Sequence, residues 1–340
     1  MTDRLDDIAA AMVARGKGIL AADESSGTIK KRFDAIGVES TEDSRRDYRE
    51  LLFRTGDAMR NHISGVILYD ETIRQKAADG TPLVDIIAAS GAVPGIKVDM
   101  GAKPLAGHPG ELVTEGLDGL RERLAEYHKL GARFAKWRAV IDIAGGIPTR
   151  GCIEANAHGL ARYAGLCQEA GIVPIVEPEV LMDGGHDIDR CFEVTEAVLN
   201  AVYDQLFTQR VRLEGSVLKP NMVISGKKCA SRAGVEEVAE KTVACLKRTV
   251  PAAVAGIAFL SGGQSDEEAT AHLSAMNAIG GLPWPLTFSY GRALQAAPQK
   301  AWSGKAENIT AAQAAFAHRA RMNSLATTGE WQAALEKQAA

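Results

Sequence analysis

Short apolar runs recur along this chain, and a longer amphipathic stretch separates each run from the next. Runs of this length bounded by glycine or charged residues are typical of buried strands, whereas the stretches between them have helical spacing. The expected strands are residues 18–22, 65–69, 95–98, 134–138, 172–177, 216–219, 256–260 and 286–289.

The stretches between the runs carry helix signals. Leu117, Leu120 and Leu124 have helical spacing, and further helices are expected before several of the later strands. Ser265 followed by Glu268 is a capping-box pattern directly after the seventh strand. Thr310 followed by Gln313 predicts the same start for the last long helix.

Eight strands alternating with helices predict an α/β fold, a parallel (β/α)8 TIM barrel. An open doubly wound sheet would need a change of winding direction, and nothing in the spacing marks one. The 340 residues alone allow one or two domains, but no linker or shift in composition divides them. We therefore expect a single domain over residues 1–340, with a barrel core at about 16–305 and a C-terminal helix and tail at 306–340.

Composition excludes several classes of function. The formal net charge is −4 and no long run of like charge occurs, so neither a nucleic-acid partner nor a membrane partner is expected. Residues 1–18 are acidic and lack an apolar signal core, and the five cysteines form no CxxC pair. These features favour a cytoplasmic protein with reduced thiols.

Charged residues stand where the strands are expected to end. In a TIM barrel the carboxyl ends of the strands carry the active site. A lysine that is desolvated and crowded by another cation gives a nucleophilic amine, so a Schiff-base enzyme is one hypothesis. The charged positions are Asp23, Glu24, Lys97, Asp99, Lys136, Arg138, Glu177, Glu179 and Lys219.

The loops after the last two strands predict a phosphate site. Backbone N–H groups in glycine turns at helix starts bind anions, and these loops hold phosphate in many TIM barrels. The candidate residues are Ser261, Gly262, Gly263, Ser289, Gly291 and Arg292.

Other chemistries have little support in the sequence. The seven histidines show no HxH, HxxH or HxxxH spacing, so no metal site is predicted. No GxGxxG motif follows a strand, and no GxSxG motif occurs.

The ordered motifs resemble class I fructose-bisphosphate aldolase. They are KGILAADES (17–25), GIKVD (95–99), FAKWR (134–138), IVPIVEPE (172–179), LKPNM (218–222), FLSGGQS (259–265) and FSYGRALQ (288–295). The resemblance implies a lyase of glycolysis and gluconeogenesis that reversibly cleaves fructose 1,6-bisphosphate into dihydroxyacetone phosphate and glyceraldehyde 3-phosphate. It implies a covalent Schiff base without metal or other cofactor, and a homotetramer.

The resemblance also implies catalytic roles for five side chains. Lys219 looks like the Schiff-base lysine, and nearby Lys136 would favour its neutral form. Glu177 is similar to the family's general acid/base, and Glu179 would tune Glu177 and position Lys136. Asp23 resembles the base that takes the proton of the C4 hydroxyl.

Two phosphate sites follow from the same resemblance. The residues after the last two strands would hold the 1-phosphate, with Arg32 able to swing in. Lys97, Ser25 and Thr28 would bind the 6-phosphate. Arg138 would contact either the substrate itself or the residues that bind the substrate. Fixing both ends of the sugar would position the bond to be cleaved.

One feature departs from the family pattern. Many members end in a tyrosine that helps proton exchange at C3 of the enamine, whereas this sequence ends in Gln338, Ala339 and Ala340. We expect that deleting the residues after Leu335 changes this exchange little.

Two alternatives stay open from the sequence. A transaldolase or deoxyribose-phosphate aldolase would also keep a lysine on the sixth strand but needs only one phosphate pocket. A non-catalytic scaffold would have lost part of the charged constellation.

Overall fold

The computed structural model describes residues 4–337, and in it eight parallel strands close into a barrel in the order β1-β10-β9-β8-β7-β6-β3-β2. This arrangement confirms the predicted TIM barrel, and every predicted strand overlaps an observed one. The barrel strands are β1 (Gly18–Ala22), β2 (Ile63–Leu68), β3 (Val93–Lys97), β6 (Phe134–Ile141), β7 (Val173–Val180), β8 (Val217–Leu218), β9 (Gly256–Phe259) and β10 (Leu286–Tyr290).

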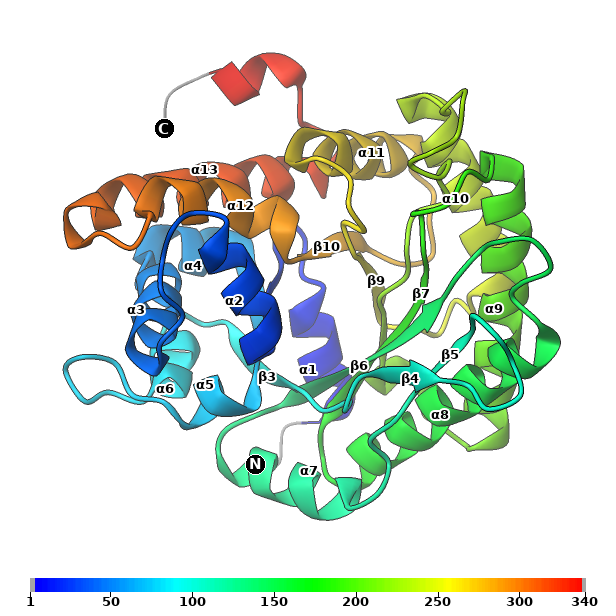
Figure 1. Ribbon diagram of the computed structural model, residues 1–340, viewed down its shortest axis with the longest axis horizontal. Helices are drawn as coiled ribbons and strands as arrows, with labels where there is room; N and C mark the ends of the chain where they lie inside the picture. The colour runs from blue at the N-terminus through cyan, green and yellow to red at the C-terminus, as the bar shows by residue number, and fades with distance from the viewer. Residues whose placement is uncertain (1–3, 338–340) are drawn as a thin grey trace.

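Helices surround the strands (Figure 1). No helix in the described part of the chain is long and apolar enough to cross a membrane. The helices are α1 (Leu5–Met12), α2 (Ser26–Asp34), α3 (Glu42–Phe53), α4 (Gly56–His62), α5 (Asp70–Arg74), α6 (Leu83–Ala89), α7 (Leu120–Lys129), α8 (Arg150–Glu169), α9 (Ile188–Thr208), α10 (Val235–Thr249), α11 (Asp266–Ile279), α12 (Arg292–Trp302) and α13 (Ile309–Ala326), with 3-10 turns η1 (Leu213–Gly215), η2 (Ala306–Asn308) and η3 (Ala333–Lys337).

The barrel interior is filled by every second strand residue. Ile19, Phe134 and Val173 belong to a core cluster inside the barrel, which α1 joins through Ile8 and Met12. Gly95 is required beside Phe134, because a β-carbon there would stand 2.3 Å from its ring. Because the interior is filled, a site can form only at an end of the barrel, and in this fold active sites form at the carboxyl ends of the strands.

Two helix starts were predicted from capping-box patterns, and the structure confirms one of them. Ser265 and Glu268 form the predicted capping box of α11. The prediction for Thr310 is wrong, because turn η2 leads directly into α13, whose N-cap is Asn308. Gln313 instead donates to the backbone oxygen of Leu51 at 3.2 Å.

A short antiparallel hairpin between β3 and α7 was not predicted. Its strands are β4 (Ala102–Pro104) and β5 (Leu112–Thr114), and Ala102 pairs with Thr114. The hairpin follows the carboxyl end of β3, so it brings Gly101 and Ala102 to the edge of the cavity described below.

Candidate active site

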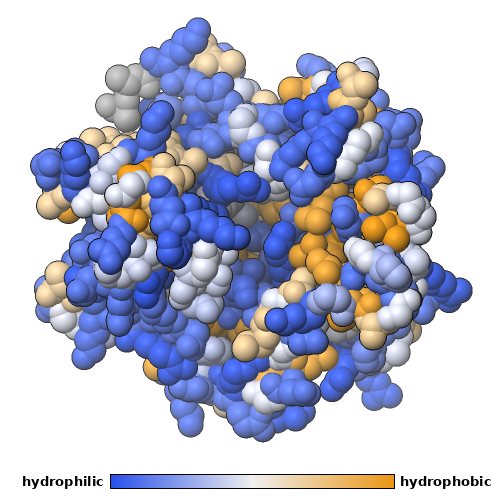
Figure 2. All heavy atoms as spheres, in the orientation of Figure 1, coloured by the Kyte–Doolittle hydropathy of each residue, from blue (hydrophilic) through white to orange (hydrophobic). Residues whose placement is uncertain are grey.

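A cavity of about 1000 Å³ opens at the carboxyl ends of the barrel strands. Residues of β1, β3, β6, β7 and β10 line it together with the loops after β3, β8, β9 and β10 and with helices α2, α5 and α7. Figure 2 shows this face hollowed near its centre, with hydrophilic side chains around much of the hollow. The charged strand ends predicted from the sequence therefore converge on one cavity.

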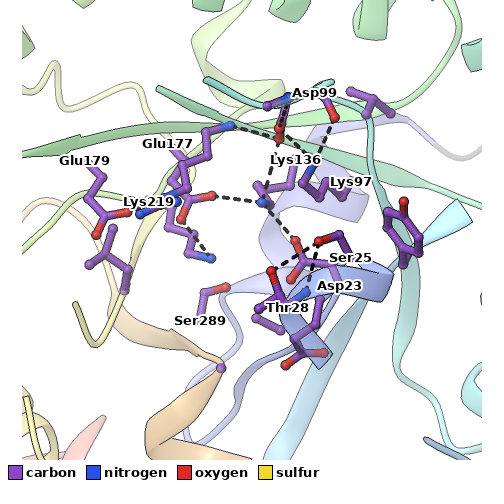
Figure 3. A pocket seen from close by; sticks show the side chains of 18 of the residues that line it. Asp23, Ser25, Thr28, Lys97, Asp99, Lys136, Glu177, Glu179, Lys219 and Ser289 are labelled. Atoms are coloured by element: carbon purple, nitrogen blue, oxygen red, sulfur yellow. Dashed lines mark hydrogen bonds and ion pairs between the residues drawn. The ribbon is translucent and has the colours of Figure 1, made fainter. Parts of the chain in front are cut away.

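Lys136 lies at the centre of the charged cluster (Figure 3). Its Nζ is 2.8 Å from Asp23 Oδ2, 3.5 Å from Glu177 Oε2 and 3.8 Å from Asp99 Oδ2. Burial alone would lower the pKa of Lys136, but these carboxylates outweigh burial and raise its pKa far above the ordinary value. Lys136 is thus a permanent cation among three carboxylates.

Lys219 follows the short strand β8, and its backbone N–H donates to Val176 O at 2.8 Å. Its side chain is buried, and Nζ lies 3.1 Å from Glu177 Oε1. The single carboxylate of Glu177 therefore contacts two amines, Lys219 through one oxygen and Lys136 through the other. A carboxyl group in that position can pass a proton to an atom bonded to the Lys219 nitrogen.

Asp23 faces Lys136 from the end of β1. Burial alone would raise the pKa of Asp23, but Lys136, Lys219 and Lys97 together lower it to about 2. The Asp23 carboxylate is therefore ionised at neutral pH and able to accept a proton.

Glu179 differs from the expectation. Its carboxylate pairs with the Nε of Arg138 and not with Lys136, so the expectation that Glu179 positions Lys136 is wrong. Burial would lower the pKa of Arg138, but Glu179 raises it, which keeps this pair charged. Glu179 lies two residues beyond Glu177 on β7, closer to the cavity mouth.

Polar groups gather at one end of the cavity around β3 and the start of α2. Lys97 Nζ is 2.8 Å from Asp99 Oδ1. Ser25 caps α2, and its Oγ lies 3.1 Å from Thr28 Oγ1. Lys97, Ser25 and Thr28 all line the cavity, as Figure 3 shows, and Lys31 also lines it although the sequence analysis gave it no role.

A second group of cavity residues comes from the end of β10 and from the loops after β9 and β10. Ser261, Gly262, Ser289, Gly291 and Arg292 line the cavity there. Gly263 lies just behind this lining, where a β-carbon would stand 3.3 Å from an Arg292 guanidinium nitrogen.

Two of these groups have unused hydrogen-bonding capacity. Among the described residues, the buried Ser289 Oγ has no hydrogen-bond partner, and Arg292 makes no ion pair. Such groups fit an anion supplied from outside.

Arg32 is held beside this end of the cavity. Its guanidinium pairs with Glu24. Glu24 also accepts a hydrogen bond from Gln295 Nε2 at 2.8 Å and lies 4.0 Å from Arg49. A β-carbon on Gly291 would stand 3.8 Å from the Arg32 guanidinium, so Arg32 lies next to the turn that follows β10.

Glu24 and Asp99 were noted in the sequence only as charges at strand ends. Glu24 fixes Arg32, and Asp99 contacts both Lys97 and Lys136. The signal for Asp99 was its spacing of two from Lys97. Within residues 4–337, no three His, Cys, Asp or Glu side chains are arranged to hold a metal ion.

Comparisons with known proteins agree with this geometry. Residues 4–340 match the family described as fructose-bisphosphate aldolase class-I. A probable fructose-bisphosphate aldolase class 1 of Xanthomonas campestris is 61% identical over 97% of this chain and 98% of its own length. The cytosolic fructose-bisphosphate aldolase 4 of Arabidopsis thaliana is 57% identical over 92% of this chain and 80% of its own.

A solved structure is also similar. The fructose-bisphosphate aldolase of Plasmodium falciparum, in a complex with TRAP and a small-molecule inhibitor, superposes with a TM-score of 0.94 at 50% identity. The match covers 96% of this chain and 95% of that one.

Proposed function

The chain belongs to the class I fructose-bisphosphate aldolase family, and on that premise we propose which of its residues carry out each step. It is a lyase that reversibly cleaves fructose 1,6-bisphosphate, acting in the manner of its family through a lysine Schiff base without a metal. Membership sets aside the transaldolase and deoxyribose-phosphate aldolase alternatives, and the complete charged cluster argues against a purely structural role.

The contact of Glu177 with both Lys219 and Lys136 carries the proposal. The unprotonated Lys219 amine attacks the C2 carbonyl of the ketose, and a proton moves to the carbonyl oxygen to give a carbinolamine. Glu177 protonates the hydroxyl, which leaves as water, and the C=N bond forms. The Lys136 cation compensates the negative charge of the surrounding carboxylates during these steps.

Cleavage follows from the same intermediate. Asp23 takes the proton of the C4 hydroxyl, the C3–C4 bond breaks, and its electron pair moves into the enamine on Lys219. Asp23 by itself is a weak base, because Lys136 at 2.8 Å helps to hold its pKa at about 2. Substrate that separates the two groups would raise that pKa and strengthen the base.

Two phosphate sites fix the substrate on either side of Lys219. The 1-phosphate lies against Ser261, Gly262, Ser289, Gly291 and Arg292, with Gly263 behind them and Arg32 beside them. The 6-phosphate lies against Lys97, Ser25 and Thr28, an assignment supported by the fact that all three side chains line the same cavity. Arg138, which pairs with Glu179, also lines the cavity and contacts the substrate.

Assembly and location complete the proposal. We propose a homotetramer in the cytosol, supported by the family and by the cytosolic relative of Arabidopsis. Light scattering of the full chain tests the assembly, because a monomer would contradict it.

Comparing two substrates tests the proposed sites. Lys97→Met should raise KM for fructose 1,6-bisphosphate by roughly tenfold while leaving KM for fructose 1-phosphate nearly unchanged, because only the bisphosphate uses Lys97. Lys103→Met, on exposed β4, is the matched control. Equal losses on the two substrates would contradict the assignment of Lys97 to the 6-phosphate.

A further inference from the structure

Lys227 lies in the loop after β8 and places a cation beside the glycine turn that follows β9. Its backbone N–H donates to Met182 O at 2.7 Å, and Lys228 N–H donates to Gly184 O at 3.0 Å. These bonds attach the loop after β8 to the loop after β7. The Lys227 side chain is 40% exposed, and its Nζ is 2.6 Å from Asp183 Oδ1.

Lys227 and Arg292 approach the same glycine. A β-carbon at Gly263 would stand 2.7 Å from Lys227 Nζ and 3.3 Å from an Arg292 guanidinium nitrogen. The Lys227 Nζ and this Arg292 nitrogen therefore lie no further from each other than the sum of those two distances. Gly263 has φ +96°, a conformation that favours glycine, and a side chain there would displace the Lys227 ammonium group.

This arrangement places more positive than negative charge at the turn. Asp183 pairs with Lys227, but among the described residues Arg292 has no carboxylate within ion-pair distance. Two cations this close repel each other unless an anion lies near both. The buried Ser289 Oγ, which has no hydrogen-bond partner among the described residues, lines the same cavity as Arg292 and can donate to such an anion.

We propose that Lys227 is a second cation for the ketose 1-phosphate, and that Asp183 competes with the phosphate for it. When the site is empty, Lys227 is paired with Asp183. When the phosphate dianion binds at the Gly262–Gly263 turn, the ammonium group moves from Asp183 to the phosphate across the space that glycine leaves open. The inference rests on the proposed 1-phosphate site and adds a residue that binds substrate without touching the reacting carbons.

Borohydride trapping separates phosphate binding from the chemistry at Lys219. The wild-type protein is incubated with dihydroxyacetone phosphate, or with dihydroxyacetone, which lacks the phosphate. Borohydride then reduces the Schiff base, and the ligand concentration that gives half-maximal trapping is measured for each ligand. Lys227→Met keeps most of the unbranched side chain and removes its charge, and Lys228→Met is the matched control at the adjacent exposed position.

Lys227→Met should raise the half-maximal concentration of dihydroxyacetone phosphate by about three- to tenfold, as expected for a partly exposed charge contact. Trapping of dihydroxyacetone should stay within twofold, and Lys228→Met should match wild type with both ligands. An unchanged value for Lys227→Met, or an equal loss with the two ligands, would overturn the inference. Wild-type protein that traps neither ligand would instead contradict the proposed function.

Asp183→Asn tests the competition. Removing this carboxylate frees Lys227 and removes a negative charge near the dianion, so dihydroxyacetone phosphate should trap at a concentration about two- to fivefold lower. Weaker trapping in Asp183→Asn would show that Asp183 supports phosphate binding and would overturn the competing role.

Discussion

Replacing Lys136 by methionine tests whether its charge holds the buried carboxylate cluster together. The Lys136 ammonium lies 2.8 Å from Asp23, 3.5 Å from Glu177 and 3.8 Å from Asp99, and all four side chains are largely buried. Removing one partner of a buried pair typically costs about 3–5 kcal/mol, because the other charge loses its compensation. Lys97 and Lys219 still face the cluster, so we expect a loss near 3 kcal/mol at neutral pH.

The loss of stability in Lys136→Met should depend on pH, because Asp23 and Lys136 have shifted pKa values in the folded protein. The pKa of Asp23 falls from 3.8 to about 2 on folding, so its contribution to stability is present above pH 3.8 and disappears as the pH falls toward 2. Lys136 contributes in the opposite sense, since its raised pKa stabilises the fold below its ordinary value of 10.5. The difference between wild type and Lys136→Met should therefore be constant from about pH 6 to 9 and shrink below about pH 4.

Urea unfolding followed by tryptophan fluorescence measures this difference at each pH. Lys300→Met, at an exposed position on α12, is the control and should behave as wild type. The double variant Asp23→Asn with Lys136→Met should recover part of the loss, because one uncompensated carboxylate is then gone. A loss under about 1 kcal/mol at neutral pH, or one that does not shrink below about pH 4, would refute the reasoning.

Other regions of the molecule give further predictions. Burial lowers the pKa of His272 to about 4, so stability should fall by roughly 3 kcal/mol between pH 6.5 and 4, and urea unfolding of His272→Gln should lack that slope. Ser289→Ala should raise KM for the bisphosphate about threefold or more without lowering the unfolding midpoint, because the Ser289 hydroxyl has no partner in the described structure; a lower midpoint without a KM effect would contradict this. Deleting the residues after Leu335 should lower the thermal midpoint, because buried Arg319 loses Glu336, while hydrogen exchange at C3 of dihydroxyacetone phosphate stays within about twofold of wild type. A large selective loss of exchange would show that the tail takes part in that step.

The barrel could be predicted because its strands are short, apolar and separated by helical patterns. The convergence of Lys97, Lys136, Glu177 and Lys219 followed from the rule that carboxyl ends of barrel strands share one face. The structure supplies the reason in its register, which pairs Lys97 with Lys136 and Arg138 with Glu177.

The errors have physical causes that a single sequence does not reveal. A spacing of two correctly places Glu177 and Glu179 on one face of β7, but a strand rises about 3.3 Å per residue. Glu179 is therefore too far along the strand for Lys136 and meets Arg138 instead. The hairpin of β4 and β5 was not predicted because its strands are largely not buried, whereas even the shorter β8 is apolar and fully buried.

Contacts between residues of different loops could not be predicted from the sequence either. Lys227, in the loop after β8, is of interest because its amine lies beside Gly263, which belongs to the loop after β9. The final residues, Gln338 to Ala340, on which the departure from the family pattern rests, lie outside the described residues.

Mapping the reduced Schiff base tests the central claim most directly. The full chain is treated with dihydroxyacetone phosphate and borohydride and then digested, and mass spectrometry locates the added mass. We predict one modified peptide, labelled at Lys219, with cleavage activity lost in proportion to labelling and unaffected by EDTA. Label at another lysine, or activity abolished by EDTA without any labelling, would contradict the assignment of Lys219 as the nucleophile.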